Sequence, residues 1–326
     1  STKARIYYNT LAANNTIMSG TGNSNQFICN FGIATTDMVS SLGTFFNPPT
    51  IGNQHTDLIK VGKSRQDINL NSGSISSIRS AFDAAHISYP TSVIVARLNG
   101  TYTTTGISDS LLVKEDECIL LNGTIRNGSG ESQTAVYFKD NNIYASFSGG
   151  TIDGSNGANG KNALIYVTGS SNIVLDSINV KKSGGEGITK RNSTSPTFIR
   201  ACKVDSSSSR GIWQLASSRL FAIENVVTNS QQYDGFDLDA YSQTAVLLKN
   251  SATSNKRYGV FIEEGANSHI LLGNTLNSNT RGISFYNMNV AAKNTSKNLI
   301  VSNICRLNQR GIHVDALLKD RATTDN

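Results

Sequence analysis

A short phrase, glycine followed by an apolar residue, recurs along the sequence at nearly constant intervals. It begins at six glycines, separated by 24, 24, 24, 23 and 29 residues: Gly187, Gly211, Gly235, Gly259, Gly282 and Gly311. The repeats also hold a second apolar segment, and an asparagine follows four of these segments, at Asn225, Asn250, Asn274 and Asn303. Asparagine at the same place in successive repeats is typical of an internal turn whose side-chain amides bond along a stack. The periodicity predicts a repeat architecture.

A period near 24 residues with short strands and no helix excludes tetratricopeptide, ankyrin and most leucine-rich repeats. What remains is an all-β parallel solenoid, in which each repeat forms one coil. Upstream of the repeats, four apolar residues share one face of a predicted helix: Ile75, Ile78, Phe82 and Ala85. Such a helix can cover the unpaired strand edges at the end of a solenoid. We expect a parallel β-helix domain over residues 71–326 and a wrapping or capping segment over residues 1–70.

The arrangement resembles the pectate-lyase-like right-handed β-helix superfamily, in which coils of this length stack into a cylinder. The resemblance covers roughly residues 70–320 of the chain. It implies a right-handed parallel β-helix and an N-terminal capping helix that plugs the open end of the cylinder.

The composition fits a turn-rich β protein rather than a disordered chain, because β-branched and aromatic residues are plentiful and regularly spaced. A net charge of +6 and a pI near 9.1 favour an anionic partner. Basic residues are dispersed and no aromatic RNA-binding motif is present, which argues against nucleic acid. No apolar run is long enough for a membrane span. We expect a secreted, periplasmic or cell-surface protein that binds a polysaccharide or oligosaccharide, and the oligomeric state stays open.

The four cysteines, Cys29, Cys118, Cys202 and Cys305, show no CxxC or zinc-ligand spacing. Cys202 and Cys305 lie four coils apart, which is about 19 Å at the usual spacing of strands. A disulfide cannot span that distance. We expect buried free thiols.

Side chains alternate between the two faces of a strand, so the register of the repeat predicts which of them point outward. The residue two after each glycine forms one outward column: Thr189, Trp213, Asp237, Phe261, Ser284 and His313. The residue four after glycine forms a second: Arg191, Leu215, Asp239, Glu263, Tyr286 and Asp315. Glu186, Arg210, Asp234, Tyr258, Arg281 and Arg310 precede the glycines. Lys190 and Gln214 fall at inward positions, so we expect the strand to bulge or end early there.

These columns concentrate aromatic and charged residues, unlike the Thr, Ser, Lys and Asn of an ordinary solvated strand. Exposed aromatic rings reduce solubility unless a ligand stacks on them, and sugars do so. The predicted substrate-binding residues are Trp213, Phe261, Arg281, Tyr286, His313 and Arg191.

Three carboxylates meet on this surface. Asp237 and Asp239 share one face of a strand, with Cα atoms roughly 6.5–7 Å apart, and Glu263 stacks about 4.8 Å above Asp239. Carboxylates this close repel one another, so one keeps a proton or a cation lies among them. An all-oxygen cluster suits Ca²⁺. We predict a calcium site formed by these three residues and expect no organic cofactor.

The phrase around Asp237 also resembles the Tyr-Gly-Phe-Asp-Pro-His-Asp motif of mannuronan C5-epimerases, which lies on a β-helix strand. Asp237 matches the catalytic-region aspartate of that family and Phe236 its inward phenylalanine. Leu238 stands where the family has proline, and Asp239 where it has the catalytic histidine. The resemblance implies chemistry on a uronate polymer such as alginate more than that exact reaction.

Three kinds of function remain open. A lyase or epimerase removes the proton α to a uronate carboxylate, with a cation to neutralise the carboxylate and a base to take the proton. The predicted catalytic residues are Asp237, Asp239, Glu263, Tyr258 and Arg210.

A glycoside hydrolase or transglycosidase instead needs two carboxylates, for which Asp237 and Asp239 suit inversion, and Asp239 and Glu263 suit retention. The Gly-His-Gly and Arg-x-Lys elements of polygalacturonases are missing. The third alternative is a non-catalytic glycan-binding β-helix. His313 lies about 14 Å from Asp237 along the stack, so we expect it at a distant subsite.

Overall fold

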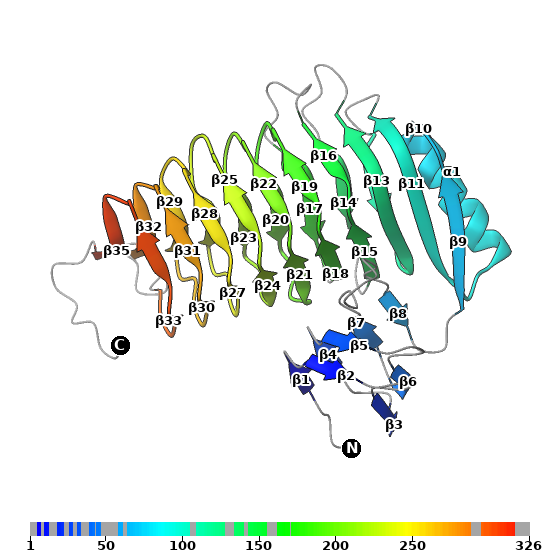
Figure 1. The fold of residues 1–326 in the computed structure, drawn as a ribbon, viewed down its shortest axis with the longest axis horizontal. Helices are drawn as coiled ribbons and strands as arrows, with labels where there is room; N and C mark the ends of the chain where they lie inside the picture. The colour runs from blue at the N-terminus through cyan, green and yellow to red at the C-terminus, as the bar shows by residue number, and fades with distance from the viewer. Residues whose placement is uncertain are drawn as a thin grey trace.

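The computed structural model describes residues 64–104, 109–127, 134–139, 143–154, 162–169, 171–287 and 295–316, together with the backbone of short strands between residues 5 and 60. It is a parallel β-solenoid of about eight turns, and the described residues include one short helix, near the N-terminus (Figure 1). That helix is too short to cross a bilayer, and the described part of the chain holds no other candidate. The predicted all-β solenoid is confirmed.

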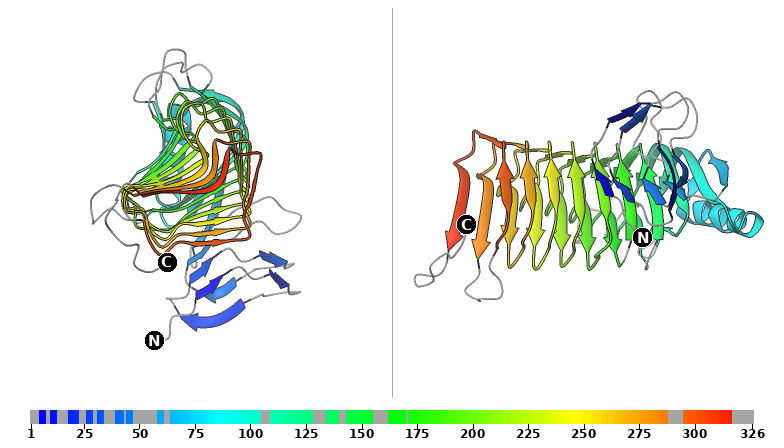
Figure 2. Two further views of the ribbon diagram at one scale, coloured as in Figure 1. Left: turned by 90° about the vertical axis from the view of Figure 1, so that its left-hand side faces the viewer. Right: turned by 90° about the horizontal axis from the view of Figure 1, so that it is seen from below.

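Each complete coil contributes one strand to each of three walls, which Figure 2 (left) shows almost end-on. The first and second walls belong to one 18-stranded sheet, in which two long strands, β11 (Val93–Thr103) and β13 (Glu117–Arg126), run through both walls. Strands β9 (Arg65–Leu70) and β10 (Gly73–Ser74) both pair with β11. The first wall continues with β15 (Ile143–Ser148), β18 (Ser171–Asp176), β21 (Thr197–Arg200), β24 (Leu220–Ile223), β27 (Val246–Leu248), β30 (Ile270–Leu272) and β33 (Leu299–Val301).

The second wall continues with β16 (Thr151–Asp153), β19 (Asn179–Lys181), β22 (Lys203–Asp205), β25 (Val226–Thr228), β28 (Ser251–Thr253), β31 (Thr275–Asn277) and β34 (Ile304–Arg306). The third wall is a separate nine-stranded sheet: β12 (Leu111–Val113), β14 (Val136–Phe138), β17 (Ile165–Thr168), β20 (Ile188–Arg191), β23 (Ile212–Leu215), β26 (Phe236–Asp239), β29 (Tyr258–Glu263), β32 (Arg281–Asn287) and β35 (Arg310–Ala316). All described pairings within the three walls are parallel, so equivalent residues of successive coils stack directly on one another.

The recurring glycines have a steric cause. A Cβ built on Gly211 would lie 2.7 Å from the carbonyl oxygen of Gly235 and 2.1 Å from a methyl group of Val227. The equivalent position at Gly259 would lie 2.8 Å from the carbonyl oxygen of Gly282. Real Cβ atoms do not approach other atoms this closely, so the corner leading into the third wall requires glycine in the coils from Gly187 to Gly282.

The predicted asparagine ladder lies at the turn between the first and second walls. The Oδ1 of Asn274 accepts hydrogen bonds from the backbone N–H and the side-chain Nδ2 of Asn250, at 2.9 and 3.0 Å. Asn225 and Asn303 continue the same pattern on either side. A second ladder, missed from the sequence, joins Asn255, Asn279 and Asn308. Buried amides that bond one another satisfy the turn in each coil.

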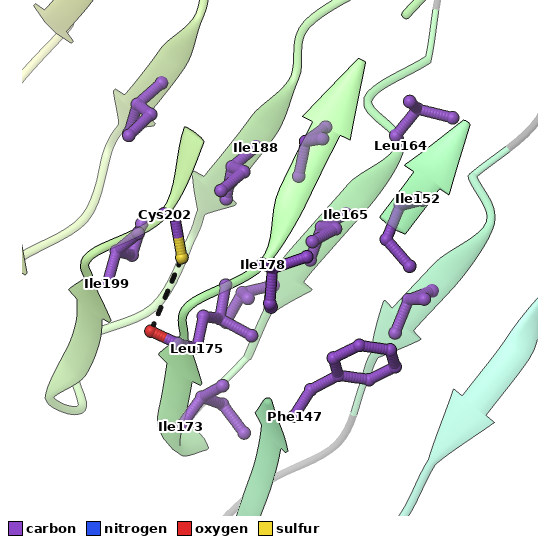
Figure 3. Packing of buried hydrophobic residues seen from close by; sticks show 14 of the residues in the cluster. Phe147, Ile152, Leu164, Ile165, Ile173, Leu175, Ile178, Ile188, Ile199 and Cys202 are labelled. Carbon is purple, nitrogen blue, oxygen red and sulfur yellow. Dashed lines mark hydrogen bonds between the residues drawn. The ribbon is translucent and has the colours of Figure 1, made fainter. Parts of the chain in front are cut away.

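The interior is packed with aliphatic side chains, as Figure 3 shows for several coils between Phe147 and Cys202. The residues one and three positions after Gly235 and Gly259 point inward and are buried: Phe236, Leu238, Val260 and Ile262. Ile312 and Val314 point the same way but are 58% and 59% exposed, because no described coil stacks beyond β35.

The expected bulge at Lys190 and Gln214 is wrong, because β20 and β23 pair in unbroken register from Ile188 with Ile212 to Arg191 with Leu215. Both polar side chains point into the solenoid and bond the backbone of a turn. The Lys190 ammonium donates to the carbonyls of Ser195 and Ser218, at 2.5 and 2.6 Å. The amide of Gln214 donates to Ser217 at 2.9 Å. These carbonyls offer what a buried donor needs, so the strand keeps its register.

The helix α1 (Ile75–Ser88) begins at Ser74, whose hydroxyl accepts from the N–H of Ser77 at 3.1 Å. Its buried face consists of the four predicted residues, Ile75, Ile78, Phe82 and Ala85. Arg79 on this helix forms a two-pronged ion pair with the fully buried Glu117 of β13, at 2.8 and 2.5 Å. The cap is therefore joined to the solenoid by both apolar packing and a buried charge pair.

Before residue 64 the structure gives eight short strands: β1 (Arg5–Tyr7), β2 (Thr10–Ala12), β3 (Met18–Gly22), β4 (Gln26–Ile28), β5 (Phe31–Ile33), β6 (Val39–Leu42), β7 (Thr44–Phe46) and β8 (Leu58–Lys60). They form one four-stranded and two two-stranded sheets. Cys118 and Cys202 are buried as expected, whereas Cys305 is only partly buried. Cys202 and Cys305 are free thiols, and Cys29 lies outside the described residues. Burial raises the pKa of Cys202 to about 12, which makes this thiol unreactive.

Candidate active site

The predicted outward columns lie on the third wall in the predicted register. Trp213 of β23 pairs with Asp237 of β26, which pairs with Phe261 of β29 and, beyond it, Ser284 of β32. Leu215 pairs with Asp239 in the second column. The first column, which contains Trp213 and Asp237, is less solvated than a surface strand normally is. Asp237 and Ser284 are fully buried, and Phe261 is only 5% exposed.

Asp237, Asp239 and Glu263 come together as predicted. One carboxylate oxygen from each lies within 4.8 Å of the others. Asp237 has no solvent exposure, whereas 13% of the Asp239 side chain remains exposed. The cluster is therefore a partly exposed group of carboxylates, one of which is fully buried.

Arg210 is the principal cation of this site. Its guanidinium donates to Oδ2 of Asp237 and lies 3.5 Å from Glu186 and 4.0 Å from Asp239. The same group stacks over the rings of Trp213 and Tyr233, at 4.5 and 4.8 Å from their centroids. Only 17% of the side chain is exposed, so Arg210 is held between aromatic rings and carboxylates.

Asp239 receives two further hydrogen bonds. Nε1 of Trp213 donates to Oδ2 at 3.1 Å, and the backbone N–H of Ala240 donates to Oδ1 at 2.6 Å. Both donors favour the ionised form of the carboxylate. Trp213 thus positions a carboxylate besides offering a ring surface.

The three carboxyl groups hold protons more strongly than free carboxylates do. Burial raises the pKa of Glu263 to about 8, and the charge of Asp239 adds to the rise. Burial also raises the pKa of Asp237 well above its usual range, although the Arg210 guanidinium opposes the shift. The pKa of Asp239 is raised by burial too, against the effect of Arg210 and its hydrogen bonds. Oδ1 of Asp237 is buried and has no hydrogen-bond partner, which fits a site that takes up a proton or a cation.

The residues also fit a metal ion. Three carboxylate oxygens facing one another form the all-oxygen donor set that calcium prefers, and Asp237 contributes the buried oxygen that lacks a partner. Asp237, Asp239 and Glu263 would hold such an ion. Bound there, it would supply positive charge to a substrate carboxylate.

A row of arginine and aromatic side chains extends from the cluster along the stack. Arg257 lies over the rings of Tyr233, Tyr258 and Phe261, at 4.8–5.0 Å from their centroids. Arg281 also lies over the ring of Tyr258, 5.0 Å from its centroid. The row brings guanidinium charge and ring surface together within reach of the carboxylate cluster.

Asp234 fixes this row in place. Its fully buried carboxylate accepts hydrogen bonds from Arg257 at 2.6 and 3.2 Å and from the backbone N–H of Tyr258 at 3.0 Å. Four residues of this site were not predicted from the sequence: Asp234, Arg257, Tyr233 and Glu186. The signal was available for Asp234 and Glu186, since both directly precede repeat glycines, as Arg210 does.

The remaining predicted substrate-binding residues are dispersed. Phe261 was expected to be exposed, which is wrong, because Arg257 and Tyr258 cover its ring. Tyr286 lies beyond it, with ring centroids 6.4 Å apart. Arg281 donates to Ser284 at 3.1 Å. Arg191 is exposed on β20, two strands from Asp239, and His313 lies on β35 within hydrogen-bonding distance of Arg310. Arg191 and His313 are therefore outside the cluster.

Comparison with known proteins identifies the fold. Residues 134–291 match the family described as the right handed beta helix region. A mutant of the periplasmic alginate epimerase AlgG superposes with a TM-score of 0.50 at 14% identity, over 69% of this chain and 57% of that one. The Dettilon tailspike protein superposes with a TM-score of 0.51 at 16% identity, over 72% and 50%.

The chain spans only about half the length of these two structures, and identities this low relate the folds alone. A search of curated protein sequences gave no match. The family match and the parallel walls agree with the architecture expected from the glycine repeat. The chain is a right-handed parallel β-helix protein.

Proposed function

We propose that this protein is a carbohydrate-active enzyme that cleaves an acidic, uronate-containing polysaccharide by β-elimination. The observation that carries the proposal is the carboxylate cluster on the third wall, in which the pKa of Glu263 is raised to about 8 while Asp239 accepts two N–H donors. A site of this kind holds an acid and a base side by side at neutral pH. The basic pI of the chain also suits an anionic polymer.

In this proposal, Asp239 removes the proton from the carbon next to the uronate carboxylate. The electron pair forms the new C=C bond as the glycosidic C–O bond breaks, and Glu263 protonates the departing oxygen. Charge that develops on the uronate carboxylate is stabilised by the nearby guanidinium groups. Tyr258, packed between Arg257 and Arg281, shapes the substrate face next to Glu263.

The placement of the two carboxyl groups favours elimination over epimerisation. Asp239 and Glu263 extend from adjacent strands of one wall, with carboxylate oxygens within 4.8 Å. Acid and base on one side of the sugar suit loss of the proton and the leaving group from the same face. C5-epimerisation would instead need a proton donor on the opposite face. An alginate epimerase among the structural neighbours is in keeping with a uronate polymer as the substrate.

The test is incubation with alginate, pectate and neutral glycans, with ultraviolet absorbance of unsaturated ends and reducing sugar measured in parallel. We expect both signals to rise together on a uronate polymer, and the activity to fall above about pH 8 as Glu263 loses its proton. Asp239→Asn and Glu263→Gln should each lower the rate by about 10²–10⁴-fold. The matched control is Glu224→Gln, which removes an exposed carboxylate from the turn that follows β24.

Calcium is tested separately by titration calorimetry and by chelation. If calcium occupies the cluster, Asp237→Asn should abolish calcium binding measured by heat as well as activity. If activity survives chelation, the active form of the cluster is the one that holds a proton rather than calcium. An acidic polysaccharide substrate is consistent with a secreted or cell-surface location, which fractionation of the source cells would check.

A second candidate is a retaining glycoside hydrolase. Carboxylate oxygens of Asp239 and Glu263 lie within 4.8 Å of each other, which suits the short carboxyl separation of retaining enzymes better than the wider one of inverting enzymes, and the raised pKa of Glu263 suits a general acid. Reducing ends without ultraviolet absorbance would select hydrolysis. Binding without either signal would select a non-catalytic glycan-binding β-helix.

A further inference from the structure

The outer face of the first wall carries two apolar columns. In one column Val246 of β27 pairs with Ile270 of β30 and then Leu299 of β33. In the other, two positions along each strand, the same three strands contribute Leu248, Leu272 and Val301. We call these six residues the aliphatic patch. They face away from the solenoid, since Leu247, Leu271 and Ile300 between them point into its core.

Much of the patch is open to solvent. Ile270 is 38% exposed, Leu272 39%, Leu299 54% and Val301 39%. In the coils of β27 and β30 the outward positions of the second wall are polar, at Ser251, Thr253, Thr275 and Asn277, whereas Ile304 in the coil of β33 is apolar and 43% exposed. The solenoid therefore does not require aliphatic residues at outward positions, and a contiguous exposed apolar patch marks an interaction surface.

The patch continues a strip that is already covered within the chain. Val174, Phe198 and Ile223 lie in the same two columns on β18, β21 and β24. They face outward, yet they are only 8%, 4% and 2% exposed and belong to a second apolar cluster outside the main core. Strand β8 contacts β15 at this end of the first wall (Figure 1; Figure 2, right). The outer face of this wall is thus an interface for its first part, which Leu248 of β27 still contacts, whereas Ile270, Leu272, Leu299 and Val301 of β30 and β33 are exposed among the described residues.

We propose that the aliphatic patch is the interface through which two copies of this chain associate. The exposed side chains are Ile, Leu and Val, without the aromatic rings or hydrogen-bonding groups that bind sugars. A second β-helix presents rows at the same spacing of about 4.8 Å, so side chains of two such walls interdigitate over several coils. A two-fold axis lets the same patch serve on both partners.

The charge of the chain is compatible with this contact. The protein carries a net charge of +6, which opposes association of two copies at random. The six patch residues are uncharged, so two copies that meet through their patches bring no like charges of the patch into contact.

The test is the mass of the intact chain in solution, measured by light scattering and sedimentation equilibrium over a range of concentrations. We expect an oligomer, and we expect Ile270→Lys with Leu299→Lys to weaken self-association by at least about ten-fold. Thr253→Lys with Thr275→Lys adds the same charge to the second wall of neighbouring coils and should leave the oligomer intact.

Leu299→Asn provides a milder variant at the most exposed patch position, should the double lysine variant fail to show the circular dichroism of the folded protein. Weaker association in Leu299→Asn, with unchanged controls, supports the proposal. A wild-type chain that is monomeric at all concentrations overturns it. So does an oligomer whose association constant the patch variants leave unchanged.

Discussion

The outer faces of the first and third walls have the same coil spacing and enclose the same core, yet their chemistry is opposite. On the third wall Asp237 and Asp239 alternate with inward Phe236 and Leu238. On the first wall of the same coil, Val246 and Leu248 flank inward Leu247. Packing determines what the inward positions must be, whereas the outward positions are free to vary. Function in a solenoid is therefore to be sought in its outward columns.

The two faces also reverse the usual distribution of residues. The third wall buries carboxylates, with Asp237 and Asp234 at 0% exposure, while the first wall exposes Ile270 and Leu272. Burying a charge destabilises a fold unless the charge is paired, and exposing large aliphatic groups promotes association. A long aliphatic interior with hydrogen-bonded asparagine ladders can stabilise a fold that carries both.

The largest effect is expected at the charged face. Arg210→Met leaves Asp237 buried beside the other carboxyl groups without its cation. We expect the free energy of unfolding to fall by about 3–5 kcal/mol, the usual effect of removing one partner from a buried ion pair. Urea denaturation followed by circular dichroism measures the change. Arg306→Met, at an exposed position of β34, is the matched control, and equal losses in both variants would contradict the structure.

The next effect concerns the ladder that joins the first and second walls. Asn274→Ala removes an acceptor from Asn250 and donors to Leu247 and Asn303. Because several buried groups lose their partners, we expect a loss of about 2–4 kcal/mol in the free energy of unfolding. Asn277→Ala in the same coil should have little effect, since its Oδ1 has no hydrogen-bond partner. Similar values for both variants would show that the ladder adds no stability.

The architecture was predictable from the sequence because sterics and turns recur in each coil. The glycines are required where one coil meets the carbonyl of the next, and the asparagines where amides stack. Register alone then brought Asp237, Asp239 and Glu263 together.

What could not be predicted depends on side-chain reach. Arg210 crosses to Asp237 and Arg257 crosses back to Asp234, and strand periodicity does not encode the direction of a long side chain. The same limit explains Lys190, whose inward position indicated a bulge until its ammonium proved to reach the carbonyls of a turn. The burial of Phe261 also follows from an arginine that the periodicity leaves unplaced.

A smaller effect on stability is expected from Glu263 on the charged face, and it should depend on pH. The pKa of Glu263 is about 8 in the folded protein against an ordinary value of 4.5, so between these values the folded state holds a proton that the unfolded chain releases. This contribution to stability is complete below pH 4.5 and is lost as the pH rises to about 8. Glu263→Gln should flatten the decline in urea midpoint over that window. An unchanged pH profile in Glu263→Gln would assign the decline to other groups.

The smallest effect is expected at the aliphatic face. Leu272→Thr, measured at a concentration low enough to exclude self-association, should change the free energy of unfolding by no more than about 0.5 kcal/mol, because the side chain is 39% exposed and threonine suits a strand. Leu271→Ala, one residue away but fully buried, should cost about 2–5 kcal/mol. If Leu272→Thr proved as damaging as Leu271→Ala, the patch would be part of the fold of one chain. A neutral Leu272→Thr means instead that stability does not require a leucine there, which leaves association with a partner as its role.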